Sequence, residues 1–424
     1  MYKKIDLKNR ARVILNHMPH MESAAIGIWV AVGSENENQK ISGISHFLEH
    51  MIFKGTPTRS TRKIKEEIEG RGGSLNGFTS EEITCYLAKV SGRHTDTALN
   101  VLSDMVLHAR MDQKDIERER AVIIEEIKMY RDLPNHHVHD LLSEMMWPDH
   151  PFGLPVAGNI RSVEAIARED LVAYKNANYV PGKITLVLCG NLRGDGLIRK
   201  IENIFRLDKK TGPASPVKFN STQTRPRIKT LHKDTEQSHL AMGMHTFGRT
   251  HRDRYVLSLL HIILGANMSS RLFESVREKR GLAYEISSEV KQYRGAGAFI
   301  VNAGIEHRNV PKALSIIVKE LKKIKRDPVP AGELKRAKEF FKVQLLLALE
   351  DTLDHMLWLG EHVLFLGRVP DKDEIIRKID SVTSNDLRRV ANTIFKNKNV
   401  NLAIIGPEKD REKAELEQEL GELS

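Results

Sequence analysis

The pattern of apolar and polar residues predicts a chain that mixes helices with strands. Residues 184–188 form a short, continuous apolar run, which is typical of a buried strand. Residues 84–90 are predicted to form a second strand. Their side chains alternate in character, as they do where successive residues face opposite sides of a sheet. Residues 115–129 instead have apolar side chains at the spacing of one face of a long helix. The sequence therefore predicts an α+β fold.

The same order of predicted elements occurs in both halves of the chain. A helix and a turn precede the strand that ends at Gly190, and the same elements precede the strand that ends at Gly406, 216 residues later. Residues 71–104, read as a turn, two strands and a helix, correspond in the same way to residues 280–315. We therefore expect two homologous α/β sandwich domains, each a mostly antiparallel sheet backed by helices.

The boundaries of these domains follow from the duplication. We expect a first domain at residues 1–210, a linker at residues 211–227 and a second domain at residues 228–424. Residues 209–216 contain Pro, Gly and Ser, as exposed connections do.

Composition and charge exclude several classes of protein. Forty per cent of the 424 residues are hydrophobic, yet no apolar run approaches the 20 or so residues of a membrane span. The net charge of +10 comes mostly from residues 211–424, which contain 36 Lys and Arg against 28 Asp and Glu, whereas residues 1–210 contain 30 against 28. These charges are interspersed along helices, and no basic block is interleaved with aromatic residues. We therefore expect no nucleic-acid or membrane partner.

Cysteine usage and the N-terminus favour the cytoplasm. Cys85 and Cys189 are the only cysteines, and each lies within a predicted strand, so a disulfide framework is not expected. The first eight residues lack the apolar core of a secretory signal and the character of a transit peptide.

The candidate chemistry is concentrated in the segment His-Phe-Leu-Glu-His. His46 and His50 are four residues apart, so on a helix both imidazoles project from one face and can reach the same metal ion. Glu49 lies beside them, where it can act on a metal-bound water. This H-x-x-E-H order is the reverse of H-E-x-x-H and is typical of the inverted zinc peptidases.

The surroundings decide between a metal site and a solvated helix face. Residues 43–55 include Phe47, Leu48 and Met51, too apolar a set for a helix that is simply exposed to water. Ionisable groups on such a helix need a reason, and shared coordination of a metal supplies one.

The third ligand has two adjacent candidates, Glu125 and Glu126. Glu119 and Glu126 are seven residues apart and return to nearly the same helix face, whereas Glu125 is rotated by about 100°. We therefore assign Glu126 as the third ligand and Glu119 as a carboxylate that orients a ligand histidine. An exposed Glu/Arg helix face is the alternative for Glu119.

Ordered motifs along nearly the whole chain resemble those of the M16 metallopeptidases, the family of mitochondrial processing peptidase, pitrilysin and insulin-degrading enzyme. The matching segments are residues 24–30, 43–56, 72–79, 119–126, 269–273 and 277–284. The resemblance is to the short, two-domain, bacterial-type members, and it implies a LuxS/MPP-like metallohydrolase fold. It also implies zinc ligands at His46, His50 and Glu126 and a catalytic carboxylate at Glu49.

We expect one zinc ion per chain, because the second half lacks a matching metal site. The second-half counterpart of the zinc helix, residues 255–265, has a single histidine, His261, and no glutamate nearby. His136 and His137 look like part of a metal tract, but they follow Pro134 and read as the start of a surface helix.

The second half instead carries an Arg and a Tyr seven residues apart, which contact the bound peptide in the family. Arg277 and Tyr284 match them. A guanidinium can hold a substrate carbonyl, and a phenol can donate to a developing oxyanion. Because these groups lie in the other half of the molecule in long family members, we expect a homodimer in which one chain completes the other's site.

The resemblance also implies how peptides bind. In the family, the segment that matches Asn76, Gly77 and Phe78 holds an extended substrate as an added strand. Relatives usually have alanine where this chain has Gly77, a small departure that we expect to be tolerated. For Tyr284, the alternative to a role in substrate contact is an ordinary aromatic side chain of a strand.

The predicted function is a zinc-dependent endopeptidase that cleaves peptides or unfolded precursor segments inside a dimer chamber. Two alternatives remain: a subunit of a heterodimeric processing peptidase with a divergent paralogue, and a zinc-silent structural or regulatory subunit. Silent relatives typically lose part of the His-Glu-His-Glu set, all of which this chain contains.

Overall fold

The computed structural model describes residues 2–192, 196–205, 219–407 and 411–423. These residues form two compact units, and each unit is assembled from separate stretches of the chain. The first contains the described residues within Met1–Lys128, Leu154–Ser215 and Leu346–Val369, and the second those within Met129–Gly153, Pro216–Leu345 and Pro370–Ser424.

The first unit is built on a mixed sheet of six strands within its described residues. In spatial order these are β1 (Lys3–Asp6), β2 (Arg12–His17), β6 (Ile184–Gly190), β3 (Ser23–Val30), β5 (Thr84–Ser91) and β4 (Ser74–Thr79). Only the β2–β6 pair is parallel. Strand β4 therefore lies at an edge of the sheet, which leaves its outer side without a strand partner among the described residues.

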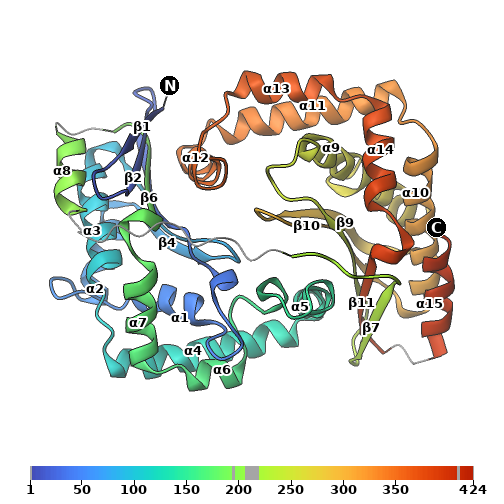
Figure 1. Ribbon diagram of the computed structural model, residues 1–424, viewed down its shortest axis with the longest axis horizontal. Helices are drawn as coiled ribbons and strands as arrows, with labels where there is room; N and C mark the ends of the chain where they lie inside the picture. Colours follow the sequence, from blue (N-terminus) through green and yellow to red (C-terminus); the bar gives the residue numbers. More distant parts are fainter. Residues whose placement is uncertain (1, 193–195, 206–218, 408–410, 424) are drawn as a thin grey trace. The chain divides into compact units, whose positions relative to one another are not determined.

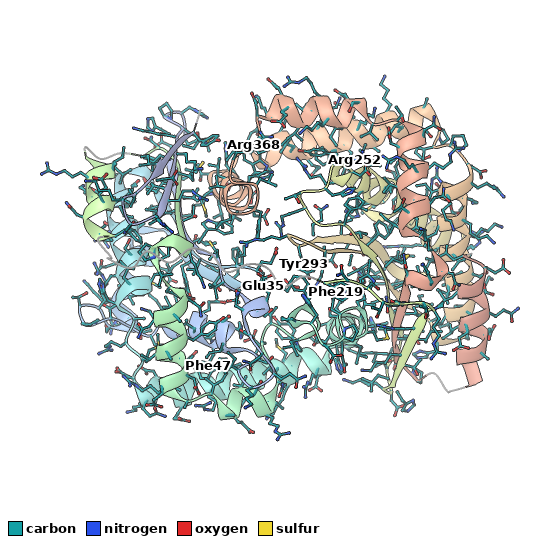
Figure 2. All side chains as sticks on the ribbon, viewed as in Figure 1. Glu35, Phe47, Phe219, Arg252, Tyr293 and Arg368 are labelled. Carbon is teal, nitrogen blue, oxygen red and sulfur yellow. The ribbon has the colours of Figure 1, made fainter. Side chains whose placement is uncertain are left out.

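Both faces of this sheet are covered by helices. They are α1 (Ile44–Ile52), α2 (Thr61–Ile68), α3 (Thr95–His108), α4 (Gln113–Asp132), α6 (Ile160–Ala165), α7 (Arg168–Asn178), α8 (Leu197–Ile204) and α12 (Thr352–Leu366). Ile26 and Ile28 of β3 pack among α1 to α4, where Phe47 of α1 is fully buried (Figure 2). Trp29, on the opposite face of the strand, packs against Met356 of α12. Because successive residues of a strand face opposite sides of the sheet, β3 contributes to the hydrophobic cores on both faces.

The second unit repeats this plan with five strands in the described chain. Their order is β7 (Arg227–His232), β11 (Val400–Gly406), β8 (Ser238–Thr246), β10 (Gly297–Ile305) and β9 (Ala283–Gln292), with β7–β11 the parallel pair. Its helices are α5 (Pro134–Met146), α9 (Arg254–Gly265), α10 (Val310–Arg326), α11 (Ala331–Ala348), α13 (Lys372–Ser381), α14 (Ser384–Ile394) and α15 (Arg411–Gly421). These two mixed sheets with covering helices confirm the α+β class, and their matching strand orders reflect the duplication.

The units differ from the two continuous domains expected at residues 1–210 and 228–424, because each half of the chain gives a helix to the other. Helix α5, from the first half, packs on β8 and β11, and helix α12, from the second half, packs on β3 and β6 (Figure 1). Each sheet has an apolar face that must be removed from water, and the exchanged helix covers it.

The expected linker lies partly in the second unit. Residues 211–218 are outside the described residues, but Phe219 packs against the apolar core beneath α5. Gln223 donates from Nε2 to the carbonyl oxygen of Val400 at 2.9 Å, so this part is docked rather than a free connection. In the described parts of the chain, no helix combines the length and apolar character that crossing a membrane requires.

Candidate metal centre

The helix that carries the His-Glu-His segment begins at a glycine that the backbone requires. Gly43 has φ of +92°, and a Cβ there would lie 2.6 Å from the carbonyl oxygen of Ala157. A buried carboxylate caps the helix: Glu37 accepts hydrogen bonds from the backbone N–H groups of Gly43 at 2.7 Å and Ser45 at 2.8 Å. These amides have no partner within the helix, so the cap fixes where α1 starts.

Helix α1 separates its apolar and ionisable side chains as the sequence pattern predicts. Its apolar residues are fully buried, namely Ile44, Phe47, Leu48, Met51 and Ile52. His46, Glu49 and His50 are half-buried on the other face. The apolar residues fix the rotation of the helix, and that rotation aims the three polar groups together.

Helix α4 supplies the acidic partners. Ile116, Ile123 and Ile127 face the core, which turns Glu119 and Glu126 towards α1. The side chain of Glu125 is 71% exposed and pairs with Lys128, so it points away from the histidines.

His46, His50 and Glu126 converge. Glu126 Oε2 lies 3.8 Å from His46 Nε2 and 3.6 Å from His50 Nε2. These separations are too long for hydrogen bonds but close to the roughly 3.3 Å between ligand atoms on one tetrahedral zinc ion. Within the described residues, this is the only group of three or more His, Cys, Asp or Glu side chains that could hold a metal.

The protonation state and donor types of these three side chains favour the binding of a cation. Burial, with a smaller contribution from neighbouring His50, lowers the pKa of His46 to about 4. The ring is therefore neutral at physiological pH, which is the form that binds metals. Two imidazoles and one carboxylate also leave a coordination position open, as catalytic zinc sites do.

Glu119 contacts His50 at the ring nitrogen that does not face the metal position. Its Oε2 lies 3.1 Å from His50 Nδ1, and its Oε1 accepts from Lys54 Nζ at 2.5 Å. Burial raises the pKa of Glu119, but the hydrogen bonds from His50 and Lys54 outweigh burial and lower it overall. An ionised Glu119 leaves His50 Nε2 free to face the metal position.

Glu49 faces the same space without joining the ligand group. Burial raises its pKa, and a hydrogen bond from Thr79 partly offsets this effect. Thr79 Oγ1 donates to Glu49 Oε2 at 2.8 Å.

The sequence did not predict two contributors to this centre, Lys54 and Thr79. Lys54 lies four residues after His50 and two residues beyond the end of α1, so its spacing from His50 could have identified it. Thr79 lies 30 residues from Glu49, and nothing in the local sequence indicates that contact.

Comparison with known proteins identifies the family. The family model described as insulinase (peptidase family M16) matches residues 12–159, and the one described as the peptidase M16 inactive domain matches residues 165–341. The chain is 37% identical to a Bacillus subtilis protein named uncharacterized zinc protease YmxG, over 96% of this chain and 98% of that one. The chain belongs to peptidase family M16.

Further relatives support the M16 membership that the sequence motifs indicated. A Mycobacterium tuberculosis protein named uncharacterized zinc protease Rv2782c is 35% identical over 96% of this chain and 93% of its own. A crystal structure of a Helicobacter pylori protease matches with a TM-score of 0.89 at 22% identity, over 96% of this chain and 99% of that one. A chain of complex III from Candida albicans matches with a TM-score of 0.82 at 17% identity, over 99% of each chain. The last two show the fold alone.

The M16 segment expected to bind peptide forms edge strand β4. Asn76 is exposed, and Gly77 and Phe78 are half-buried. The Phe78 ring packs edge-on against Trp29, with 5.8 Å between ring centroids. On its inner side, the backbone of β4 pairs with β5 from Ser74 to Thr79.

Arg277 and Tyr284 lie together in the second unit. Arg277 is part of a π-helical turn, Phe273–Glu278, a rare conformation that is frequent at functional sites. Its guanidinium carbon lies 4.8 Å from the centroid of the Phe273 ring and 5.5 Å from that of Tyr284. Tyr284 is the extra residue in the β9–β10 ladder, where Gly304 pairs with Glu285 and Ile305 with Ala283. Such a bulge re-aims a side chain, and Tyr284 is 75% exposed.

The two other histidine positions considered from the sequence lie outside this centre. His261 of α9 is half-buried, and its Nδ1 lies 2.8 Å from Ser288 Oγ. Helix α5 begins at Pro134, and His136 is exposed beside the ring of Tyr130.

Proposed function

We propose that this M16 protein is a zinc-dependent endopeptidase, a metalloendopeptidase that hydrolyses peptides or unfolded precursor segments. The observation that carries the proposal is the convergence of His46, His50 and Glu126 beside the carboxylate of Glu49. The names of its relatives as zinc proteases support the metal and the reaction class.

His46, His50 and Glu126 would hold one zinc ion per chain. When bound, zinc lowers the pKa of a water towards neutrality and polarises the scissile carbonyl. Glu49 accepts the proton of the attacking water and delivers it to the leaving amine. Its raised pKa suits this exchange, because a base that is too acidic would not take the proton. Glu119, held by Lys54, keeps His50 in its orientation.

Substrate would bind as an extended strand along β4, at Asn76, Gly77 and Phe78. Edge strands present unpaired backbone groups, and pairing with them is largely indifferent to side chains. Broad sequence tolerance is the expected consequence.

Arg277 and Tyr284 would complete the site by holding the substrate carbonyl and the developing oxyanion. In its described surroundings Arg277 contacts two aromatic rings and no carboxylate, so its charge is available to a ligand. We propose that these groups act across a homodimer, between chains that enclose the substrate. Two buried, free cysteines agree with a cytoplasmic location.

The test is metal content and cleavage of a mixed peptide library by protein expressed alone. Wild-type protein should contain one zinc per chain and cleave internal bonds. Glu49→Gln should retain zinc and lose nearly all activity, whereas His50→Ala should lose both. Absence of stoichiometric metal from the wild type, or full activity in Glu49→Gln, would contradict the proposal.

A further inference from the structure

Strand β4 contacts Glu49 as well as offering an edge to substrate. Thr79, the last residue of β4, donates its hydroxyl proton to Glu49 Oε2 at 2.8 Å. Thr79 is paired with Thr84 at the end of the ladder with β5, so its backbone is fixed by the sheet. The hydroxyl therefore reaches Glu49 from a rigid support.

The other carboxylate oxygen of Glu49 faces Gly77. A Cβ added to Gly77 would lie 3.2 Å from Glu49 Oε1 and 3.0 Å from Cζ of Phe53. Both distances are shorter than comfortable van der Waals contact between such atoms. Glu49 Oε1 thus lies beside the backbone of β4 at Gly77 while Oε2 accepts from Thr79, so both carboxylate oxygens face this strand.

We propose that Thr79 is a positioning residue for Glu49, so that the strand that captures the peptide also aims the general base. Thr79 holds Oε2 in place, which leaves Oε1 as the oxygen that handles the proton. This inference rests on the proposed peptidase function, and it assigns a role that peptide capture alone does not require.

Strand β4 would therefore affect both peptide binding and the position of the general base. A peptide that pairs with β4 lies against the same backbone that fixes the Glu49 carboxylate, so the strand sets the position of the substrate relative to the base. Catalysis is sensitive to displacements of about 1 Å, and one hydrogen bond can therefore change kcat without changing affinity.

The first test compares Thr79→Val, which keeps the shape and removes the hydroxyl, with Thr79→Ser, which keeps the hydroxyl. In zinc-loaded enzyme with a fluorogenic peptide, Thr79→Val should lower kcat about tenfold or more, and KM should change little. Thr79→Ser should stay within about threefold of the wild type. Zinc content and melting temperature should be equal in all three. Equal kcat in Thr79→Val and wild type would overturn the inference while leaving the peptidase proposal intact.

A binding measurement separates positioning from a merely structural role. Fluorescence anisotropy of a labelled, uncleaved peptide should give the same Kd for Glu49→Gln and for Glu49→Gln combined with Thr79→Val. A weaker Kd in the double variant would mean that Thr79 supports the strand edge rather than the base, and would also overturn the inference.

Thr79→Ala is a second variant should Thr79→Val fold poorly. It also removes the hydroxyl and should lower kcat about tenfold or more at unchanged zinc content. Unchanged kcat in this variant would likewise overturn the inference. If the wild type itself neither binds zinc nor cleaves peptide, the proposed function fails first, which is a distinct result.

Discussion

His50 and Glu119, 69 residues apart in the chain, are joined by a 3.1 Å contact between Nδ1 and Oε2. The contact joins α1 to α4, the two helices that contribute all three candidate ligands. It also leaves the Nε2 atom of His50 to face the metal position. Glu119 is buried and has Lys54 as a second partner, so its orientation is fixed from both ends.

Glu119→Gln should therefore weaken zinc binding about 10- to 100-fold, because outer partners orient a ligand and raise its basicity. Competition with a chelator of known affinity measures the effect. Glu125→Gln is the matched control, since Glu125 is exposed on the same helix and should leave zinc affinity unchanged. Equal affinities in the two variants would show that Glu119 does not support His50.

Much of this centre could be predicted from local periodicity. Three apolar isoleucines on α4 determine which face is buried, and that face alone selects Glu126 over Glu125. The helix predicted at residues 115–129 is observed as Gln113–Asp132. Helical spacing predicts which side chains share a face, because that relation involves only one helix at a time.

Relations between elements could not be predicted in the same way. The contact of Thr79 with Glu49 depends on how β4 lies beside α1, and the aim of Tyr284 depends on a bulge opposite Gly304. The exchange of α5 and α12 is a further case. Their apolar residues show that each helix is covered, but not which sheet covers it. One sequence without contact information contains no signal for that choice.

The packing of α12 on the first sheet gives a prediction about stability. A Cβ on Gly360 would lie 2.3 to 2.5 Å from atoms of the buried Trp29 ring. Gly360→Ala should therefore reduce the free energy of unfolding by about 1–3 kcal/mol, because neither the ring nor the helix can move freely. Urea unfolding checks this value.

Gly332→Ala is the control for that experiment. A Cβ on Gly332 of α11 would lie 3.8 Å from its nearest neighbouring side-chain atom, Arg336 Nη1. Alanine is the better helix former, so this variant should be as stable as the wild type or more stable by up to about 1 kcal/mol. Equal loss in both variants would contradict tight packing at Gly360.

His261 predicts a pH dependence of stability that is unrelated to the metal centre. Burial lowers its pKa from 6.5 to about 4. Between these values the unfolded chain binds a proton that the folded chain resists, so the free energy of unfolding falls as pH decreases below 6.5. By pH 5 this group alone should remove about 2 kcal/mol.

The measurement is urea unfolding at pH 7 and pH 5, with chelator present so that metal loss does not contribute. His261→Gln should lose about 2 kcal/mol less than the wild type over this interval. The exposed His20→Gln should behave as the wild type does. Parallel losses in His261→Gln and the wild type would show that His261 is not the responsible group.

The proposed sharing of Tyr284 between chains can be tested by mixing inactive variants. His50→Ala removes the metal site of its own chain, and Tyr284→Phe removes the phenol of its own chain. If the phenol acts across the dimer, a mixed dimer contains one complete site: the zinc of the Tyr284→Phe chain with the tyrosine of the other. Random pairing at equal amounts should then recover about a quarter of wild-type activity.

Mixing His50→Ala with Glu49→Gln is the matched negative control. Both changes lie in the same metal centre on α1, so no pairing of these chains yields a complete site. Activity in the first mixture and none in the control would place Tyr284 in the partner's site. No recovery in either mixture, with dimers verified by light scattering, would mean that each chain uses its own tyrosine or none.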